Sequence, residues 1–150
     1  MAGFYGEYRA KVDDKGRVVF PSAFKALFGS DDELKFIIKP SLYSSCLEMY
    51  TRSEWDTSSE EVRSRLNMFN REHAAFWREY NRGAAPVEPD GKIGRINIPK
   101  NLAEGLGIVP GMEVVFFGSG YFIEIWPKEQ FDATRMRPCD YTALAEKLLG

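Results

Sequence analysis

The stretch "DDKGRVVFPSAFKALFG" (residues 13–29) recurs in altered form as "DGKIGRINIPKNLAEGLG" (residues 90–107). Each version has Gly-Arg, a short apolar run, a proline, a run of helical character and a closing glycine. Gly16-Arg17 aligns with Gly94-Arg95 at a shift of 78 positions, and "LEMY" (47–50) aligns with "IEIW" (123–126) at a shift of 76. Two copies are too few for a solenoid, so we expect two halves that complete one another's core.

Each copy predicts the order strand, turn, strand, short helix, strand, strand. The proline stops the second strand because it cannot donate to a ladder, and it can begin a helix. The expected elements of the first copy are strands at 7–12, 18–20, 36–39 and 46–50 and a helix at 22–27, and those of the second copy include strands at 114–117 and 121–126. Short antiparallel strands with an inserted helical turn predict an α+β fold of small barrel-like units.

A helical connector is predicted between the copies. Two overlapping capping boxes, Thr57 with Glu60 and Ser58 with Glu61, predict that it begins near residue 57. Apolar or ring residues then recur with the spacing of one helix face, at Val62, Leu66, Phe69, His73, Phe76 and Tyr80. We expect a break at Asn70, an end at Gly83, and packing of this stripe on its own domain, with a subunit contact as the alternative. Near the end of the chain, Asp140 is the expected N-cap of a helix at 141–149.

The composition predicts a folded cytoplasmic protein. Of the 150 residues 44% are hydrophobic, which is enough for a core, and the net charge of −2 gives no global sign of a nucleic-acid binder. Only two cysteines occur, which fits a reducing compartment better than a disulfide scaffold. No apolar run approaches the roughly 20 residues of a membrane span, and the first residues do not resemble a signal peptide, so no membrane partner is expected.

The turn at 13–17 carries the chemistry of an anion site. A turn glycine, Gly16, lets backbone amides approach a phosphate, and Lys15 and Arg17 can neutralise it. Arginine can also read guanine in the major groove, and Asp13 is expected to hold the Arg17 guanidinium in one orientation. The alternative is an ordinary hairpin turn with a weak surface ion pair. The recurrence of Gly-Arg in the second copy favours binding of a nucleic acid over an ordinary turn. Other basic residues near the two turns are added to the predicted contacts.

The predicted DNA contacts are Lys15, Arg17, Lys92, Arg95, Arg9 and Lys11. Asp13 is expected to orient Arg17, and Gly16 and Gly94 are expected to permit the two turns.

Enzyme and cofactor motifs find little support. His73 is the only histidine and lies on the helical stripe, so a core or interface role is expected. No histidine or cysteine cluster has metal-ligand spacing, and no phosphate-binding loop or nucleophile elbow occurs. Glu48 and Glu124 occupy matched strand positions; we expect outward-facing strand residues, with an acidic pair of a hydrolase as the alternative. We therefore expect no enzyme, no cofactor and no small-molecule substrate.

The order of motifs resembles the MraZ family of bacterial transcriptional regulators, in the AbrB/SpoVT-like swapped-hairpin superfamily. The resemblance rests on Gly-Glu-Tyr (6–8), "DDKGRVVFPSAF" (13–24), "GRINIP" (94–99), "GIVPGMEVVFF" (107–117) and "IEIWPKEQF" (123–131), and covers about residues 4–131.

The family signature is Asp-x-x-x-Arg, once per half. Asp13 and Arg17 fit it in the first copy. In the second, Gly91 stands four residues before Arg95, and Asp90, which the resemblance implies as the supporting residue of this motif, is one place early. The second half is therefore expected to bind DNA less specifically.

The resemblance implies two interlocked AbrB-like swapped-hairpin half-domains that form a double barrel. We expect half-domain 1 at 7–54, the helical connector at 55–83, half-domain 2 at 84–131 and a tail with a short helix at 132–150. It also implies a nucleoid-associated regulator that binds double-stranded DNA at short direct repeats in the promoter of the division and cell-wall gene cluster. Family members assemble with themselves into closed rings, which implies a homo-oligomer of about eight or more subunits. The alternative is an antitoxin-like or other protein-interaction module without its own promoter site.

Overall fold

The computed structural model describes residues 3–150, and it is an α+β fold with a six-stranded sheet, a two-stranded sheet and several helices. The first copy contributes β1 (Phe4–Lys11), β2 (Arg17–Val19), α1 (Ser22–Lys25), a 3₁₀ turn η1 (Asp31–Glu33), β3 (Phe36–Pro40) and β4 (Leu47–Thr51). The connector contains α2 (Arg52–Ser64) and α3 (Arg71–Arg82). The second copy contributes β5 (Ala85–Val87), β6 (Arg95–Asn97), α4 (Lys100–Gly105), β7 (Glu113–Gly120) and β8 (Ile123–Pro127), followed by α5 (Lys128–Ala133) and α6 (Pro138–Leu149).

The two copies exchange strands. The large sheet has the order β1-β7-β8-β4-β3-β5, so β1 of the first copy pairs with β7 of the second, and β5 of the second pairs with β3 of the first. Between them, β4 pairs with β8, and the separate two-stranded sheet joins β2 to β6. All these pairings are antiparallel and each has a counterpart when the copies are interchanged. The repeat in the sequence therefore corresponds to a pseudo-two-fold axis that relates the two copies in the fold.

Two strand boundaries differ from expectation by about three residues: β1 begins at Phe4 instead of residue 7, and the end of β7 lies beyond residue 117. The second hairpin was expected to turn at 118–120, but β7 continues to Gly120 and the chain turns at 121–122. Gly118 explains this, because a Cβ there would lie 2.5 Å from the backbone nitrogen of Tyr5. The missing side chain lets β1 lie against β7 along its whole length.

The core lies between the two sheets. Alternate residues of the large sheet point inward, where they meet Val18 and Ile96 from the small sheet. The largest fully buried rings are those of Phe4, Phe20, Phe24, Phe36 and Phe116. Burying one such side chain contributes about 1.5–3 kcal/mol, so this cluster holds the small sheet firmly against the large one.

The opposite face of the large sheet has a smaller apolar cluster. Cys46, Val115 and Trp126 are buried there, and Phe131 of α5 packs on them. Both cysteines are free thiols, Cys46 buried and Cys139 exposed. Burial, with the Glu124 and Glu48 charges nearby, raises the pKa of the Cys46 thiol to about 12.

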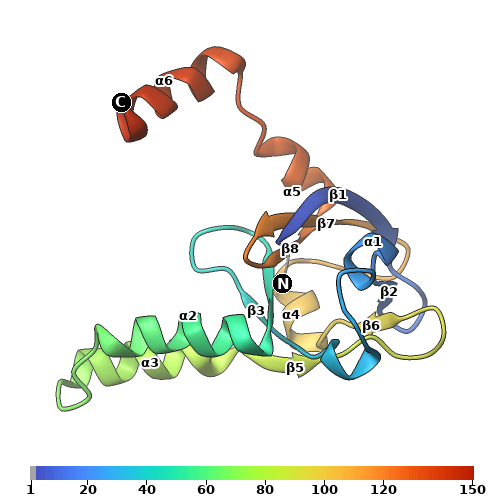
Figure 1. The fold of residues 1–150 in the computed structure, drawn as a ribbon, viewed down its shortest axis with the longest axis horizontal. Helices are drawn as coiled ribbons and strands as arrows, with labels where there is room; N and C mark the ends of the chain where they lie inside the picture. Colours follow the sequence, from blue (N-terminus) through green and yellow to red (C-terminus); the bar gives the residue numbers. More distant parts are fainter. Residues whose placement is uncertain (1–2) are drawn as a thin grey trace.

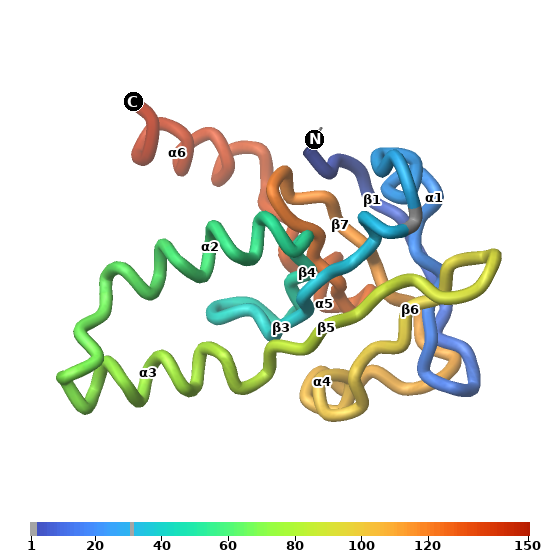
Figure 2. The backbone as a smooth tube through the Cα atoms, turned by 60° about the horizontal axis from the view of Figure 1, so that its bottom comes forward, coloured from blue at the N-terminus to red at the C-terminus, as the bar shows by residue number. Residues whose placement is uncertain are grey.

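The connector forms a hairpin of two helices that projects from the sheets like an arm (Figures 1 and 2). The expected break at Asn70 is confirmed, since its side chain caps α3 by accepting hydrogen bonds from the amides of Glu72 and His73. The expected end at Gly83 is also confirmed.

The expected helix start at 57 is wrong. The amide of Glu54 donates to Thr51 Oγ1 at 3.2 Å, so α2 begins directly where the buried strand β4 ends. Thr57 instead lies inside the helix, and its hydroxyl donates to the carbonyl of Ser53. Thr51 and Glu54 have the same spacing as the two capping boxes predicted at 57–61. The helix begins after Thr51 because the buried strand β4 ends there.

Packing of the helical stripe on its own domain is also wrong. No residue of α2 or α3 is buried, and Phe69 lies fully exposed in the turn between the helices. His73 is not in a core: its Nδ1 accepts a hydrogen bond of 2.8 Å from the amide of Asn67 and so fixes this turn. The base of the arm contacts the large sheet, where Trp55 packs edge-on against Tyr50 of β4 and Lys39 of β3 lies over the ring of Tyr80. Trp55 also stacks on Tyr80 and so joins the two helices there.

The chain ends in a second projection, α6, which lies away from the sheets (Figure 1). This helix begins at Pro138, earlier than expected, and Asp140 is not its N-cap. Asp140 lies in the first turn and pairs with Arg137 at 2.9 Å, while Pro138 presets the first helical position. Among residues 3–150, no helix is long and apolar enough to cross a membrane.

Candidate nucleic-acid interface

The ribbon formed by β2 and β6 brings the two Gly-Arg motifs together. Val18 pairs with Ile96, and both side chains are buried against the core. Successive residues of a strand point to opposite faces, so the residues on either side of this pair point outward. The exposed face of the ribbon therefore carries four residues, Arg17, Val19, Arg95 and Asn97.

The two turns that precede the arginines lie at opposite ends of the ribbon. Arg17 is paired with Asn97 and Arg95 with Val19, so each arginine stands at the start of its own strand. Both turns project from the side of the molecule away from the helical arm (Figure 2). Arg17 and Arg95 are diagonal neighbours on this strand pair, and the Cα atoms of such neighbours are about 7–8 Å apart, so both side chains begin on the same face of the ribbon.

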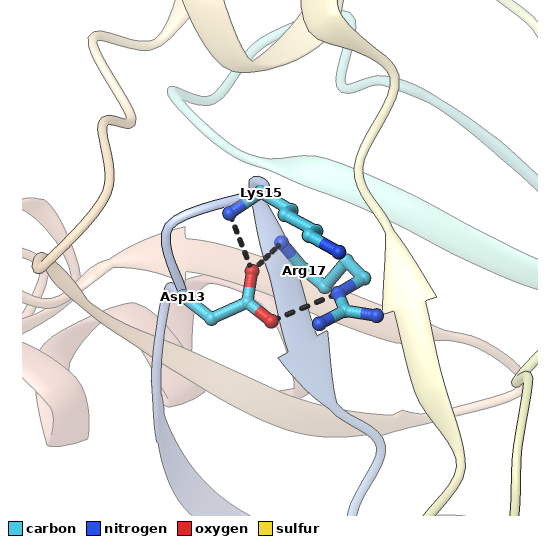
Figure 3. A network of polar contacts seen from close by, with 3 residues as sticks. All are labelled: Asp13, Lys15 and Arg17. Carbon is cyan, nitrogen blue, oxygen red and sulfur yellow. Dashed lines mark hydrogen bonds and ion pairs between the residues drawn. The ribbon is translucent and has the colours of Figure 1, made fainter.

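The first turn holds its arginine in a fixed orientation. Asp13 Oδ1 accepts hydrogen bonds from the amides of Lys15 and Arg17, at 3.0 and 2.8 Å (Figure 3). Asp13 Oδ2 accepts a hydrogen bond of 2.9 Å from Arg17 Nε, which leaves the terminal nitrogens of the guanidinium free. Gly16 makes this turn possible, because its φ of 78° is in the left-handed region.

The three hydrogen bonds that Asp13 accepts, which we call the clamp, also change the pKa of its carboxyl. The amide of Arg17 contributes most, and with the Arg17 side chain and the Lys15 amide it lowers the pKa of the Asp13 carboxyl below its ordinary value of 3.8. The carboxylate is therefore ionised at neutral pH and keeps the arginine in place.

The second turn is built differently. The amide and carbonyl of Asp90 pair with those of Arg95 at 2.8 and 2.9 Å, so the loop of Gly91 to Gly94 is one residue wider than the first turn. Within residues 3–150, no side-chain hydrogen bond or ion pair joins Asp90 to Arg95. Asp90 thus orients the backbone of the turn, while the Arg95 guanidinium has no carboxylate clamp.

Basic residues flank both turns. Lys15 and Lys92 are exposed in the two loops, as a phosphate contact requires. Lys25 was not among the predicted contacts, yet it reaches from α1 to the second turn, where its Nζ is 3.8 Å from the position that a Cβ on Gly94 would take. It supplies positive charge next to the arginine that lacks a clamp.

The remaining two predicted contacts are placed less favourably. Lys11 is exposed at the end of β1, opposite Glu113, just before the first turn. Arg9 lies on the face of the large sheet that is opposite the ribbon. There it lines a groove of about 950 Å³ together with Phe117, Trp126 and Tyr141. The structure therefore does not bring Arg9 to the ribbon.

Sequence reasoning missed two residues of the ribbon face, Val19 and Asn97. Val19 is 42% exposed, which is high for a β-branched residue between buried neighbours. The sequence does contain the signal for them. Side chains alternate along a strand, so if Val18 and Ile96 point into the core, Val19 and Asn97 must lie on the same outer face as Arg17 and Arg95.

The matched glutamates lie side by side elsewhere. Glu48 and Glu124 are directly opposite on β4 and β8, on the pseudo-two-fold axis of the large sheet. Tyr50 donates to Glu48 at 2.9 Å, and Trp126 donates to Glu124 at 3.0 Å. Each carboxylate is thus held by an aromatic residue of its own strand, and this pair is separate from the ribbon.

Comparison with known proteins connects this geometry to a family. A family model described as "MraZ protein, putative antitoxin-like" matches residues 4–79 and 81–137. The chain is 34% identical over 149 residues to "Transcriptional regulator MraZ" of Bacteroides fragilis, with 99% of this chain and 92% of that protein covered. It is 39% identical over 130 residues to the protein of the same name from Acetivibrio thermocellus, with 87% and 85% covered. A third relative of that name, from Clostridium acetobutylicum, is 34% identical over 145 residues, with 97% and 96% covered.

Proposed function

The chain belongs to the MraZ family, and from this premise we propose that it is a sequence-specific DNA-binding transcriptional regulator and not an enzyme. The observation that carries the proposal is the ribbon, whose exposed face presents Arg17 and Arg95 symmetrically. The names of the relatives support the same role.

The ribbon suits the major groove of double-stranded DNA. That groove is about 12 Å wide and admits a two-stranded antiparallel ribbon. Arg17 and Arg95 would contact base edges or neighbouring phosphates, and Lys15 and Lys92 would contact phosphates on either side. Gly16 would let the backbone of the first turn approach a DNA strand closely. Gly94 is buried and would support the shape of the second turn, because its φ of 80° is in the left-handed region.

We further propose that the fold is a pair of interlocked swapped-hairpin half-domains that form a double barrel. The exchange of β1 and β5 between the copies supports this description. The half-domains would be residues 7–54 and 84–131, with the connector at 55–83 and the tail at 132–150 as separate units.

The assembly that we propose is a ring of identical subunits in the cytoplasm, associated with the nucleoid. One ribbon offers few contacts, whereas a closed ring presents several ribbons to repeated boxes and increases the avidity. Exposed apolar side chains of the helical arm, such as Phe69 and Phe76, would supply part of the subunit contact. The expected target is a set of short direct repeats in the promoter of the division and cell-wall gene cluster.

A protein-interaction module of antitoxin type is the second candidate. It is favoured by the description of the matching family model and by the two projecting helical elements. A protein partner that co-purifies with the chain, together with no affinity for DNA, would support this candidate.

Selection of bound fragments from random double-stranded DNA tests the proposal. The wild-type protein should enrich one short motif, and the double variant Arg17→Ala/Arg95→Ala should not. Arg63→Ala/Arg65→Ala, on the arm, removes the same charge away from the ribbon and should leave the motif unchanged. Equal loss of enrichment in both double variants would show that net charge, and not the ribbon, is responsible.

A further inference from the structure

The pseudo-two-fold symmetry of the ribbon face is broken at one pair of positions. A shift of 78 relates Arg17 to Arg95, which are identical, but it relates Val19 to Asn97, which are not. Both positions are on the exposed face, with Val19 42% exposed and Asn97 exposed at the end of β6. The two halves of the ribbon face therefore carry the same arginine but a different second residue. We call these second residues, Val19 and Asn97, the companions of the arginines.

The register assigns one companion to each arginine. Asn97 is directly opposite Arg17, and Val19 is directly opposite Arg95. Directly opposed residues have Cβ atoms about 4.5–5.5 Å apart, so each companion stands within reach of the base pair next to the one its arginine contacts. The buried pair of Val18 and Ile96 fixes the register, because a slip of one residue would turn these side chains outward.

The two companions have different chemistry toward bases. An asparagine amide can bind adenine in bidentate fashion through N6 and N7, whereas an aliphatic side chain contacts the methyl group of thymine. Among the described residues, no side-chain hydrogen bond engages the Asn97 amide, so both its donor and its acceptor are available for a base.

We propose that Val19 and Asn97 determine the base preference next to each arginine contact, so that each subunit reads a box with two unlike halves. This inference rests on the proposed DNA-binding function and deepens it. The half read by Arg17 and Asn97 has guanine next to adenine, and the half read by Arg95 and Val19 has guanine next to a pair that presents a thymine methyl. A box with unlike halves has a direction, so identical subunits that face the same way in a ring read boxes repeated head to tail.

Four proteins test the proposal in the same selection from random DNA. Wild type should yield a non-palindromic motif. Val19→Asn should exchange the thymine preference for adenine by about tenfold in relative enrichment, which makes the two halves alike. Asn97→Val should make them alike in the opposite sense. The double exchange Val19→Asn/Asn97→Val should restore two unlike halves, which loss of one interaction could not do.

A control and a fold measurement make the outcome decisive. Tyr43→Asn introduces the same amide at a site that is 93% exposed, in the loop between β3 and β4, and should leave the motif unchanged. Circular dichroism should show that all variants are folded, because the substituted side chains face solvent. An unchanged motif in the single variants, with binding intact, would overturn the inference and leave the proposed function standing. Failure of the wild type to enrich any sequence would overturn both.

Discussion

Asp13 is the residue on which the difference between the two turns depends. Its carboxylate accepts three hydrogen bonds from the turn that follows it, whereas the equivalent position of the second copy is Gly91. One arginine of the ribbon is thus preorganised and the other pays the cost of ordering its side chain when it binds.

The two arginines should therefore contribute unequally to specificity. Arg17→Ala is expected to cost about 1–3 kcal/mol of discrimination between the selected box and a variant with its guanine replaced. Arg95→Ala should cost less, because its guanidinium has no carboxylate clamp. Affinities of both variants for matched and mismatched duplexes measure this. A larger loss of discrimination in Arg95→Ala would show that the clamp does not matter for readout.

The stabilising effect of the Asp13 clamp depends on pH. Because the pKa of Asp13 is lowered in the folded protein, its stabilising contribution is complete above the ordinary aspartate pKa of 3.8 and is lost as the pH falls through the lower folded value. The largest cause is the amide of Arg17, which Arg17→Ala retains. NMR titration of the Asp13 carboxyl should thus give a midpoint below 3.8 in the wild type and an intermediate one in Arg17→Ala. A midpoint at the ordinary value in that variant would assign the whole effect to the side chain.

At the scale of elements, the repeat predicted more than the local signals did. It placed β2, β4 and β8 near their observed positions, because each position was supported by two copies of the sequence. Local signals alone misplaced the starts of α2 and α6, since several capping patterns overlap and burial of neighbouring chain decides among them. The exposure of the arm could not be predicted. The apolar residues of a helix have the same spacing whether they face their own domain or another subunit, so the sequence does not distinguish the two cases.

Of the candidate site, the Asp13–Arg17 contact could be predicted from spacing within one turn. The position of Arg9 could not, because it depends on which face of the large sheet the ribbon covers. That choice is made by the pairing of β1 with β7, which joins residues far apart in the sequence.

The start of α2 offers a stability test with an internal control. Thr51→Ala removes the hydroxyl that accepts from the Glu54 amide and should lower the free energy of unfolding by about 1 kcal/mol. Thr51→Ser keeps the hydroxyl and should retain most of the stability. Thr57→Ala, inside the helix, should change it by less than about 0.5 kcal/mol. Denaturation with urea compares the three variants, and an equal loss in Thr51→Ala and Thr57→Ala would contradict the observed helix start.

At the scale of the whole molecule, binding should depend on both salt and assembly. Each phosphate contact contributes about −0.9 to the slope of log affinity against log salt, and a single ribbon offers few contacts. A steep slope, together with tighter binding to tandem boxes than to one box, would indicate that several subunits are engaged. Light scattering gives the mass of the assembly, and shifting the boxes by half a helical turn should weaken binding. A monomer that binds one box as tightly as a tandem array would exclude the ring.

The pairing of β1 with β7 has a consequence for how the protein is made. Phe4 is paired with Gly120, 116 positions later, so the first strand leaves the ribosome on the order of ten seconds before its partner exists. During that interval its edge is open to the second copy of another nascent chain, and dimers with exchanged halves compete with the monomeric fold. Refolding should accordingly be slow, as in other proteins with distant strand pairs, and its yield should fall as the protein concentration rises. A refolding yield that does not depend on concentration would show that each chain finds its own second half first.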